Sequence, residues 1–437
     1  MVDPAEDSPH RLSSDRALED PTGDRLGYAP FARQLARSVL HGCPADGLVV
    51  ALYGEWGTGK TTALNFITYY LEQAEDAPLV MRFNPWWFAG QEDLTRRFFK
   101  QFEATFARGR ARNRKLLSRL ATFSAMVGEM PVPYVGSAGK AAKALLSTAE
   151  KSDVVQLKAE IASALAEDAR RMIVVVDDID RLVAEEIRQL FRLIKAVADF
   201  PNVIYLLAFD RSVASRAMGE MHGGSGEEYL EKIVQVPFTL PPPDRLQLQA
   251  LLFERLNHIL ADTPPNLFDE QNWGNVYLEG IDGFIAKPRD TVRFTNALGV
   301  TYAGVRGEVN AVDFVALEAL RVFCPGAYDV VRTHPAKFAG AMPSGEWGKA
   351  ARDEERKFHE GWLASIPQPQ RECVRNLVFR LFPRLSAIFG TTTYGSDWAQ
   401  RWRQGLRVCS EEIFPVYFRL SVPAGEVSAS EVNEVLT

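Results

Sequence analysis

One short stretch near the start of the chain decides the fold, and it reads Gly47-Leu48-Val49-Val50-Ala51-Leu52-Tyr53-Gly54-Glu55-Trp56-Gly57-Thr58-Gly59-Lys60-Thr61-Thr62. Its first part is a continuous apolar run, which is typical of a strand buried on both faces of a sheet. Its second part fits the spacing G-x-x-x-x-G-K-[ST] at every fixed position. A helix is expected to follow, with Leu64, Ile67 and Leu71 on one side.

A glycine-rich turn between a strand and a helix has the chemistry of a phosphate-binding loop. The glycines let backbone N–H groups surround a phosphate without Cβ clashes, and the helix N-terminus adds positive potential. Lys60 supplies a compact cation for the β- and γ-phosphates, and the Thr61 hydroxyl is a hard oxygen ligand for Mg²⁺. The expected nucleotide-binding residues are Gly54, Glu55, Trp56, Gly57, Thr58, Gly59, Lys60, Thr61 and Thr62.

A second apolar run, Ile173–Val176, ends in the two carboxylates of Asp177 and Asp178. Ligands of parallel sheets bind at the carboxyl ends of the strands, so both acids are expected to face Thr61. Asp177 is expected to hold Mg²⁺, and Asp178 to orient or deprotonate an attacking water. The alternative for Asp178 is a helix N-cap without a catalytic role.

Further apolar runs at Leu79–Phe83, Val203–Phe209 and Ile233–Val236 alternate with helical patterns. This alternation predicts an α/β fold in which helices cover both faces of a parallel sheet, in three layers. Pro237 and the prolines at 241–243 are expected to close the sheet region. Only helical patterns follow Asp244, and the last hundred residues show no clear period.

Composition bounds the class of protein. The chain has 437 residues, 46% of them hydrophobic, and a net charge of −6, so it is not a polycation that coats nucleic acid. Its four cysteines have no metal-ligand spacing, which favours free thiols in a reducing compartment. The N-terminus is polar and lacks a signal peptide, and the most apolar segment, 116–146, is interrupted by charges and prolines. We therefore expect a soluble, cytoplasmic protein without an integral membrane span.

Several blocks of this sequence resemble the KAP family of P-loop NTPases. The most distinctive of them holds Asn84-Pro85-Trp86-Trp87. The matching blocks are Gly54–Thr62, Phe83–Leu94, Asp177–Leu182, Leu207–Arg211, Lys232–Phe238, Arg289–Phe294 and Leu317–Arg321. They follow one another in the family's order from about residue 24 to residue 335.

The resemblance implies an ATPase of the additional-strand type that uses ATP and Mg²⁺, with a helical lid after the sheet. It also implies that Asp210 senses the γ-phosphate, that Arg289 or Arg293 reaches back from the lid, and that Arg181 or Arg211 acts as an arginine finger. The alternative for each arginine is a structural salt bridge. Many members carry membrane helices between the two phosphate motifs, whereas residues 108–152 of this chain lack a usable span. Bacterial members are often linked to defence against phage and mobile elements.

The resemblance and the composition together suggest four regions. These are a disordered tail at 1–20, an NTPase core at 21–240 with an insertion at 108–152, a helical lid at 241–335 and a mostly helical region at 336–437.

Alternatives for partners and function stay open at this point. The basic stretch Arg108–Lys115 suits nucleic acid or anionic lipid, or is a solvated helix face. Trp86 and Trp87 suit stacking on a base or a partner, or packing in the core. The chain is an ATPase switch or motor, a scaffold with a structural nucleotide, or a nucleic-acid-binding effector. A homo-oligomer or a protein partner is compatible with each of these.

Overall fold

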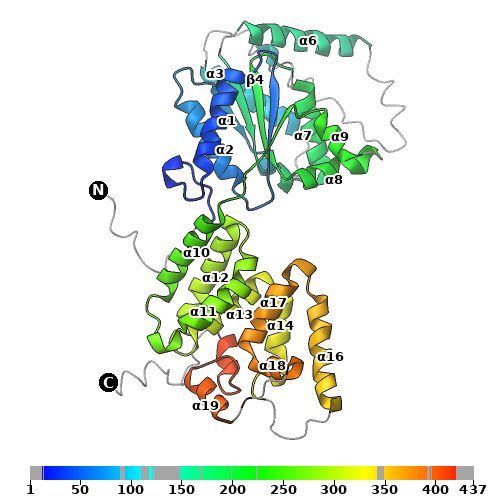
Figure 1. Ribbon diagram of the computed structural model, residues 1–437. Helices are drawn as coiled ribbons and strands as arrows, with labels where there is room; N and C mark the ends of the chain where they lie inside the picture. The colour runs from blue at the N-terminus through cyan, green and yellow to red at the C-terminus, as the bar shows by residue number, and fades with distance from the viewer. Residues whose placement is uncertain are drawn as a thin grey trace. The chain divides into compact units, whose positions relative to one another are not determined.

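The computed structural model divides into two compact units (Figure 1). The sheet unit comprises Arg16–Asp244, and the helical unit comprises Arg245–Thr437 together with Met1–Asp15. The residues that the structure describes are 12, 14–88, 94–109, 118–120, 122, 148–167, 170–197, 199–222, 225–341, 349–390, 394 and 396–419.

The described part of the sheet unit contains one five-stranded parallel sheet. Its strands are β1 (Leu48–Tyr53), β2 (Leu79–Phe83), β3 (Met172–Val176), β4 (Val203–Phe209) and β5 (Val236–Thr239). They lie in the order β2-β3-β4-β1-β5, so β4 separates β1 from β3. This confirms the additional-strand arrangement. Tyr53 pairs with Phe209 and Val176 with Leu207. The carboxyl ends of β1, β4 and β3 therefore lie side by side at the same end of the sheet.

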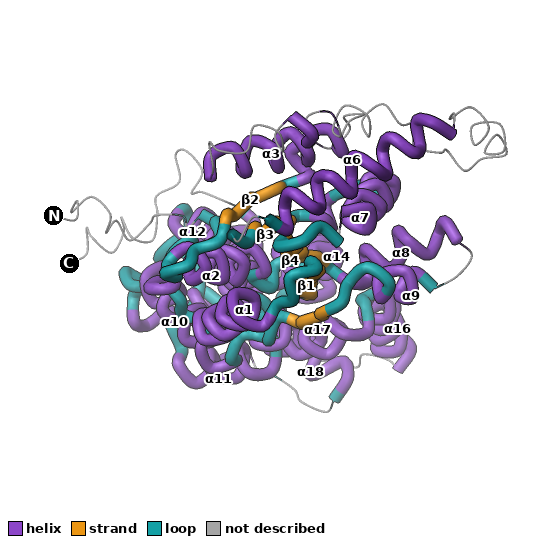
Figure 2. Tube along the Cα trace, turned by 90° about the horizontal axis from the view of Figure 1, so that it is seen from above, coloured by secondary structure: helices purple, strands orange, loops and turns teal. Residues whose placement is uncertain are grey.

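Helices cover both faces of this sheet (Figure 2). On one face, α1 and α2 bury a cluster that includes Leu35 and Phe66 against β1 and β4. On the other face, α3, α6 and α7 bury a second cluster that includes Phe102 and Phe191. The three-layer α/β/α prediction is therefore confirmed. The helical segments are η2 (Pro21–Gly23), α1 (Tyr28–Gly42), α2 (Lys60–Glu72), η3 (Pro85–Phe88), α3 (Leu94–Gly109), α6 (Thr148–Ala166), η4 (Ile179–Arg181), α7 (Ala184–Val197), α8 (Arg211–His222) and α9 (Gly226–Glu231).

The last strand differs from the sequence-based expectation. A strand was expected at Ile233–Val236, but Ile233 and Val234 are buried in the turn after α9 and β5 begins at Val236. Pro237, expected to end the region, lies inside β5 and pairs with Ala51. The position tolerates proline because β5 is an edge strand, so a missing N–H costs the sheet no ladder bond on its outer side.

The helical unit contains helices throughout its described residues. Nearly every side chain of α13 is buried, so this helix forms the centre of the unit. Its Asp313 is fully buried and accepts hydrogen bonds from Arg407 Nε at 2.6 Å and from the Val408 amide at 3.0 Å. The helical segments are α10 (Arg245–Leu260), η5 (Pro265–Leu267), α11 (Glu270–Glu279), η6 (Ile281–Phe284), α12 (Pro288–Ala303), α13 (Ala311–Phe323), α14 (Pro325–Thr333), α15 (Pro335–Phe338), α16 (Lys349–Ser365), α17 (Gln368–Leu381), α18 (Pro383–Phe389), α19 (Ser396–Gln404) and η7 (Phe414–Phe418).

Two of the expected regions fall largely outside the described residues. Residues 1–11 and 13 of the tail are not described, while Leu18 near its end donates its amide to Thr62 Oγ1 at 3.3 Å. Most of the 108–152 insertion is also not described, including the side chains of the basic stretch Arg108–Lys115. Among the helices that the structure does describe, none combines the length and apolar character needed to cross a bilayer.

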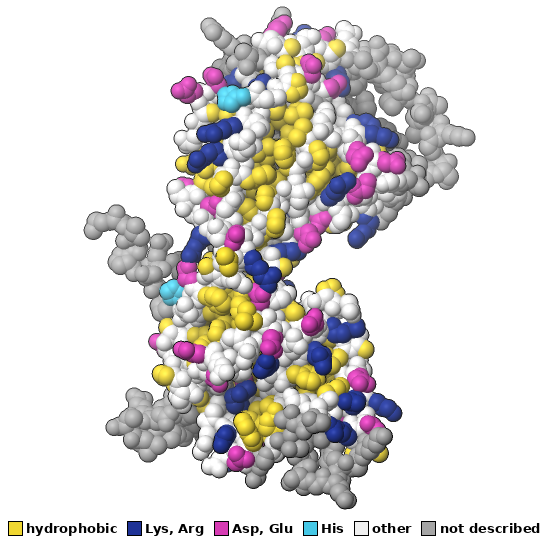
Figure 3. All heavy atoms as spheres, viewed as in Figure 1, with side chains coloured by type: hydrophobic (Ala, Val, Ile, Leu, Met, Phe, Trp, Pro, Cys, Tyr) yellow, Lys and Arg dark blue, Asp and Glu magenta, His cyan; other side chains and the backbone are white. Residues whose placement is uncertain are grey.

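Charged side chains of both signs are mixed on the face of each unit that Figure 3 shows. Neither unit presents a field of one sign there, in keeping with a net charge of only −6. All four cysteines are free thiols.

A glycine-to-alanine pair tests the packing of α8 against α9. A Cβ on Gly226 would overlap the carbonyl oxygen of Ser215 and lie 2.8 Å from the Gly219 nitrogen, whereas a Cβ on Gly42 would meet nothing within 4 Å. We expect Gly226→Ala to lower the free energy of unfolding by about 1–3 kcal/mol, since overpacking shifts the backbone. Gly42→Ala should stay within about 1 kcal/mol of the parent chain. Urea unfolding of the two variants checks this, and equal stabilities would contradict the close approach.

Candidate nucleotide site

The loop between β1 and α2 has a backbone that requires glycine. Gly57 and Gly59 have φ angles of 83° and 94°, in the left-handed region that side chains with a Cβ avoid. A Cβ on Gly54 would lie 2.8 Å from Thr58 Oγ1. The Gly54 amide donates to the Phe209 carbonyl at 3.2 Å, which fastens the start of the loop to β4. The loop is therefore preformed as a cradle of backbone groups.

Tyr28 of α1 supports the same loop from the side. Its hydroxyl donates to the Thr58 carbonyl at 2.7 Å, and a Cβ on Gly59 would lie only 3.0 Å from its ring. Burial, and secondly the charge of Asp24, raise the pKa of Tyr28 to about 12. The phenol therefore stays a hydrogen-bond donor throughout the physiological range.

Lys60, the first residue of α2, is only 7% exposed. Its ammonium donates to the carbonyls of Gly54 at 2.9 Å and Glu55 at 3.2 Å, and to Asp180 Oδ2 at 2.9 Å. The ion pair is almost completely buried on both sides. The lysine is thus held across the mouth of the loop by a carboxylate that the sequence analysis did not single out.

Thr61 and Asp177, the two expected metal ligands, lie near each other, since hydrogen bonding from the Thr61 side chain acts to lower the pKa of Asp177. The Asp177 carboxylate accepts a hydrogen bond from the Asp178 amide at 2.8 Å. Burial raises the pKa of Asp177, and the negative charge of Asp178 raises it further, while the Thr61 bond opposes both. A buried carboxylate with little compensating charge attracts a cation. Within the described ranges, no three His, Cys, Asp or Glu side chains gather as a metal-ligand group. Mg²⁺ fits this site nonetheless, since it commonly takes one or two protein oxygens and completes its shell with phosphates and water.

Asp178 has two side-chain partners, one for each oxygen. Asn84 Nδ2 donates to Oδ2 at 2.7 Å, and Arg181 Nε lies 2.7 Å from Oδ1. Asp178 precedes η4 with a left-handed φ of 58°, and its side chain makes no capping bond to that helix. The structure therefore places Asp178 as an oriented carboxylate rather than as a side-chain N-cap.

Asp210 follows β4 at the same edge of the sheet. Its Oδ1 accepts hydrogen bonds from the Ser212 amide at 2.9 Å and the Ser212 hydroxyl at 2.7 Å. It therefore caps the start of α8. Arg211 beside it pairs with Glu227 and lies over the Tyr53 ring at 5.6 Å.

The remaining predicted residues are more scattered. Glu55 and Trp56 lie on the exposed rim of the loop, whereas Thr62 Oγ1 accepts the Leu18 amide. Arg289 and Arg293 lie on α12 of the helical unit. Arg289 pairs there with Asp15 at 2.9 Å, and Arg293 donates to the Val322 carbonyl at 3.0 Å.

Sequence reasoning missed three contributors, Tyr28, Asn84 and Asp180. Asp180 gave a visible signal as the third acid of the run Asp177-Asp178-Ile179-Asp180. Asn84 was part of the distinctive Asn-Pro-Trp-Trp block, and its side chain also accepts the Trp86 amide at 3.0 Å. Arg181, which binds Asp178, lies over the Trp86 ring at 5.1 Å. Trp86 and Trp87 themselves are exposed rather than packed in the core.

A double-mutant cycle tests the Lys60–Asp180 ion pair. Asp180→Ala leaves a buried ammonium with two carbonyl partners, so we expect the free energy of unfolding to fall by about 2–4 kcal/mol. The double variant Lys60→Met/Asp180→Leu should lose less than the sum of its two single changes. Asp199→Ala, which removes the partner of the exposed Lys158, should cost less than about 1 kcal/mol. Urea unfolding measures all of these, and strictly additive losses would show that the pair is not coupled.

Comparisons with known proteins give the chain a place among relatives. Its sequence matches the KAP family P-loop domain over residues 28–305. The Phage T7 exclusion protein of Escherichia coli (strain K12) is 26% identical over 380 residues, which are 80% of this chain and 51% of the relative. The chain therefore spans about half the length of the curated relative that it matches.

Solved structures resemble this chain only loosely. A Drosophila ORC structure bound to DNA gives a TM-score of 0.39 at 12% identity, covering 100% of this chain and 93% of that one. The Aeropyrum pernix ORC2 protein gives 0.37 at 11% identity, covering 94% and 98%. TM-scores this low carry no property of those proteins over to this chain. The family match, in contrast, covers more than half of the 437 residues and includes the loop after β1, the acids after β3 and the Asn84 block. The chain belongs to the KAP family of P-loop NTPases.

Proposed function

We propose that this chain binds ATP with Mg²⁺ at the loop of residues 54–61 and hydrolyses it, and that it works as a switch or motor. The observation that carries the proposal is the preformed glycine loop, whose Lys60 bonds directly to Asp180 in the acidic run that follows β3. Lys60 and Asp178 lie at the same edge of the sheet, each held by defined partners. A scaffold that only kept a nucleotide in place would not need an oriented carboxylate there.

The backbone amides of the loop and the N-terminus of α2 would bind the phosphates of the nucleotide. Mg²⁺, when bound, neutralises charge between the β- and γ-phosphates, and Thr61 and Asp177 are the residues that would hold it. Lys60 would add its ammonium on the phosphate side. The Lys60–Asp180 pair supports this role, because it already fixes the lysine over the loop and keeps its charge paired.

Asp178 would orient the attacking water and accept its proton. A carboxylate does this well only if its oxygens are held at a fixed direction. Asn84, between β2 and η3, and Arg181, in η4, supply that restraint, each on one oxygen of the carboxylate. Asn84 is therefore a positioning residue that acts through Asp178.

Arginines are proposed in two further roles. Arg181 or Arg211 would stabilise charge on the transferring phosphoryl group. Both arginines are in ion pairs, but Arg181 is the better candidate in cis, because its partner Asp178 is itself a residue of the site, whereas Arg211 pairs with Glu227 of α9. Arg289 or Arg293 would serve if the helical unit closes as a lid. Asp210 would sense the γ-phosphate through its second carboxylate oxygen, Oδ2, because its Oδ1 caps α8.

The biological setting follows from the relative rather than from the site. We propose that the chain takes part in defence against phage, on the strength of its 26% identity to a phage exclusion protein. The nucleic-acid alternative depends on Arg108–Lys115, whose side chains lie outside the described residues.

Two variants separate binding from turnover. Lys60→Ala should weaken ATP binding at least about 10-fold, because it removes the cation that faces the phosphates. Asp178→Asn should keep ATP affinity within about 3-fold and lower turnover by roughly 100-fold or more. Calorimetry measures the affinity, and phosphate release measures the rate. Lys158→Ala, a surface lysine paired with Asp199, is the matched control and should leave both unchanged.

Equal ATP affinity of the parent chain and Lys60→Ala would refute the nucleotide site. Intact affinity together with a parent rate no faster than that of Lys60→Ala would favour the scaffold instead. Circular dichroism of each variant shows whether the fold is retained.

Replacing Asn84 with alanine tests the positioning of Asp178. We expect kcat to fall about 10-fold with KM nearly unchanged, because the carboxylate loses one of its two restraints and no contact with the nucleotide. Asn65→Ala is the matched control, since that amide binds Arg82 at 3.0 Å and not an acid of the site. A change of KM without a change of kcat would place Asn84 in binding and contradict this role.

A further inference from the structure

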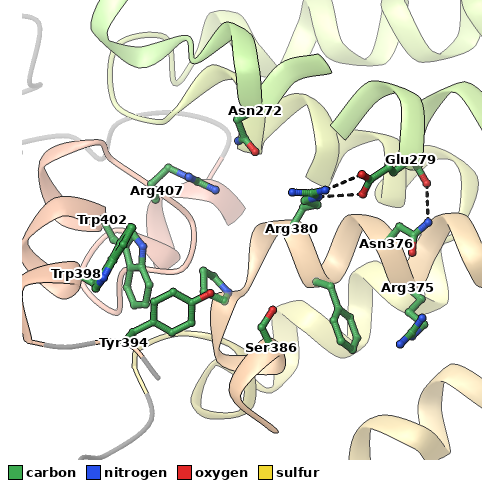
Figure 4. A pocket seen from close by; sticks show the side chains of 12 residues that line it. Asn272, Glu279, Arg375, Asn376, Arg380, Ser386, Tyr394, Trp398, Trp402 and Arg407 are labelled. Atoms are coloured by element: carbon green, nitrogen blue, oxygen red, sulfur yellow. Dashed lines mark hydrogen bonds and ion pairs between the residues drawn. The ribbon is translucent and has the colours of Figure 1, made fainter. Parts of the chain in front are cut away.

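The helical unit contains a cavity that no step proposed above uses. It has a volume of about 380 Å³ and is lined by residues of α11, α17, α18 and α19 and of the segment after α19 (Figure 4). Cavities of this size accommodate small organic ligands when a few polar groups converge on an apolar wall. The lining of this cavity has both features.

One wall is aromatic. Tyr394, Trp398 and Trp402 form a cluster whose ring centroids lie 5.4–6.4 Å apart. Trp402 is nearly buried, whereas Trp398 keeps 38% of its surface exposed. Packed aromatic rings with a face left open to a cavity are a platform on which a planar group stacks.

Two arginines, Arg380 and Arg407, make the rest of the lining cationic. Arg380 of α17 and Arg407 approach from opposite sides, and their guanidinium groups point toward one another in Figure 4. Arg380 is held by Glu279 through Nε at 2.9 Å and Nη2 at 2.6 Å, and Arg407 by buried Asp313 through Nε at 2.6 Å. A guanidinium has five N–H donors, so each retains donors beyond these bonds. Two facing guanidinium groups favour an anion between them.

Two amide side chains, those of Asn272 and Asn376, also line the cavity. Asn272 points into the cavity in Figure 4, and its Nδ2 is buried with no hydrogen-bond partner among the described residues. A buried donor without a partner costs free energy, and a ligand acceptor would satisfy it. Asn376 donates Nδ2 to the Glu279 carbonyl at 3.0 Å, which turns the amide so that its oxygen remains for a ligand donor.

We propose that this cavity binds a nucleoside monophosphate unit, either as a free nucleotide or as one nucleotide of a single strand. The base stacks on the aromatic wall of Tyr394, Trp398 and Trp402, and the phosphate lies between Arg380 and Arg407. Asn272 donates to an acceptor on the base. The combination matches a nucleotide better than a simple anion, which would leave the aromatic wall unused, and better than an apolar ligand, which would leave the arginines and Asn272 without partners.

The three arginines and one glutamate of the lining also give it an excess of positive charge in a chain whose net charge is −6. Arg375 contributes one of these charges and stacks on Phe379 at 4.9 Å. This site is separate from the loop of residues 54–61, and the proposal does not depend on hydrolysis there.

The test uses the full chain carrying Lys60→Ala, so that the loop does not contribute. The probes are 5′-AMP, a short single-stranded deoxyadenylate and inorganic phosphate, followed by calorimetry and tryptophan fluorescence. We expect AMP or the oligonucleotide to bind one-to-one, at least about 10-fold more tightly than phosphate. Tighter binding of AMP identifies a free nucleotide as the source, and tighter binding of the oligonucleotide identifies a strand. If neither probe binds more tightly than phosphate, the proposal is wrong.

Variants in the same background locate the site. Trp398→Ala and Arg380→Gln should each weaken binding of the better probe by roughly 10-fold or more, and Trp398→Phe should restore much of the loss. Arg380 is exposed on α17, so its replacement tests the site even if Trp398→Ala impairs folding. The controls are Leu278→Ala, an exposed position of α11 outside the lining, and Arg332→Gln, an exposed arginine of α14. Binding that survives both Trp398→Ala in a folded chain and Arg380→Gln would place the nucleotide elsewhere.

Discussion

The parallel register of β1, β4 and β3 is the constraint on which the nucleotide site depends. Tyr53 pairs with Phe209, and Val176 pairs with Leu207, so the residues that follow each strand emerge at one edge. Side chains alternate along a strand, so a shift of one residue would turn every buried side chain of β4 to the other face. Because both faces of this strand are packed, that shift is strongly opposed. The cores on the two faces therefore fix the site as firmly as any contact within it.

The second constraint is electrostatic, since three carboxylates lie within four consecutive residues at this edge. Each of them has its own partners: Asn84 with Arg181 for Asp178, Lys60 for Asp180, and the Asp178 amide for Asp177, which also lies near Thr61. Only Asp177 lacks a paired cation in direct contact, and burial together with Asp178 raises its pKa. The local charge balance thus leaves one place where a divalent cation would be stabilised, and it is the place where Thr61 offers a hydroxyl oxygen.

Local sequence patterns predicted the parts of the fold whose signal is local. The runs of β1, β3 and β4 are continuous and apolar, and the loop glycines have left-handed φ angles that the motif anticipates. The pattern misplaced β5, because Ile233 and Val234 are as apolar as a strand but belong to a turn. It also gave no period for the last hundred residues, where prolines in the first turn start helices such as α17 and α18. The contacts that complete the site join residues 30 and 94 positions apart, and no local period reports such pairs.

In the cavity of the helical unit, too, a lining side chain is held in place by buried contacts. Arg407 lies after the last long helix, yet Asp313 at the centre of the unit holds its Nε, and the next residue, Val408, gives its amide to the same carboxylate. Burial of Asp313 makes this pair hard to break, because separating it would leave an uncompensated charge in the core. Burial acts to lower the pKa of Arg407, but the charge of Asp313 and its hydrogen bond outweigh this and raise the pKa, so the guanidinium stays charged. A guanidinium fixed in this way loses little freedom when it binds an anion, which is how preorganised binding sites gain affinity. A merely structural salt bridge would be expected to turn its remaining donors to the protein, whereas Arg407 turns them into the cavity toward Arg380.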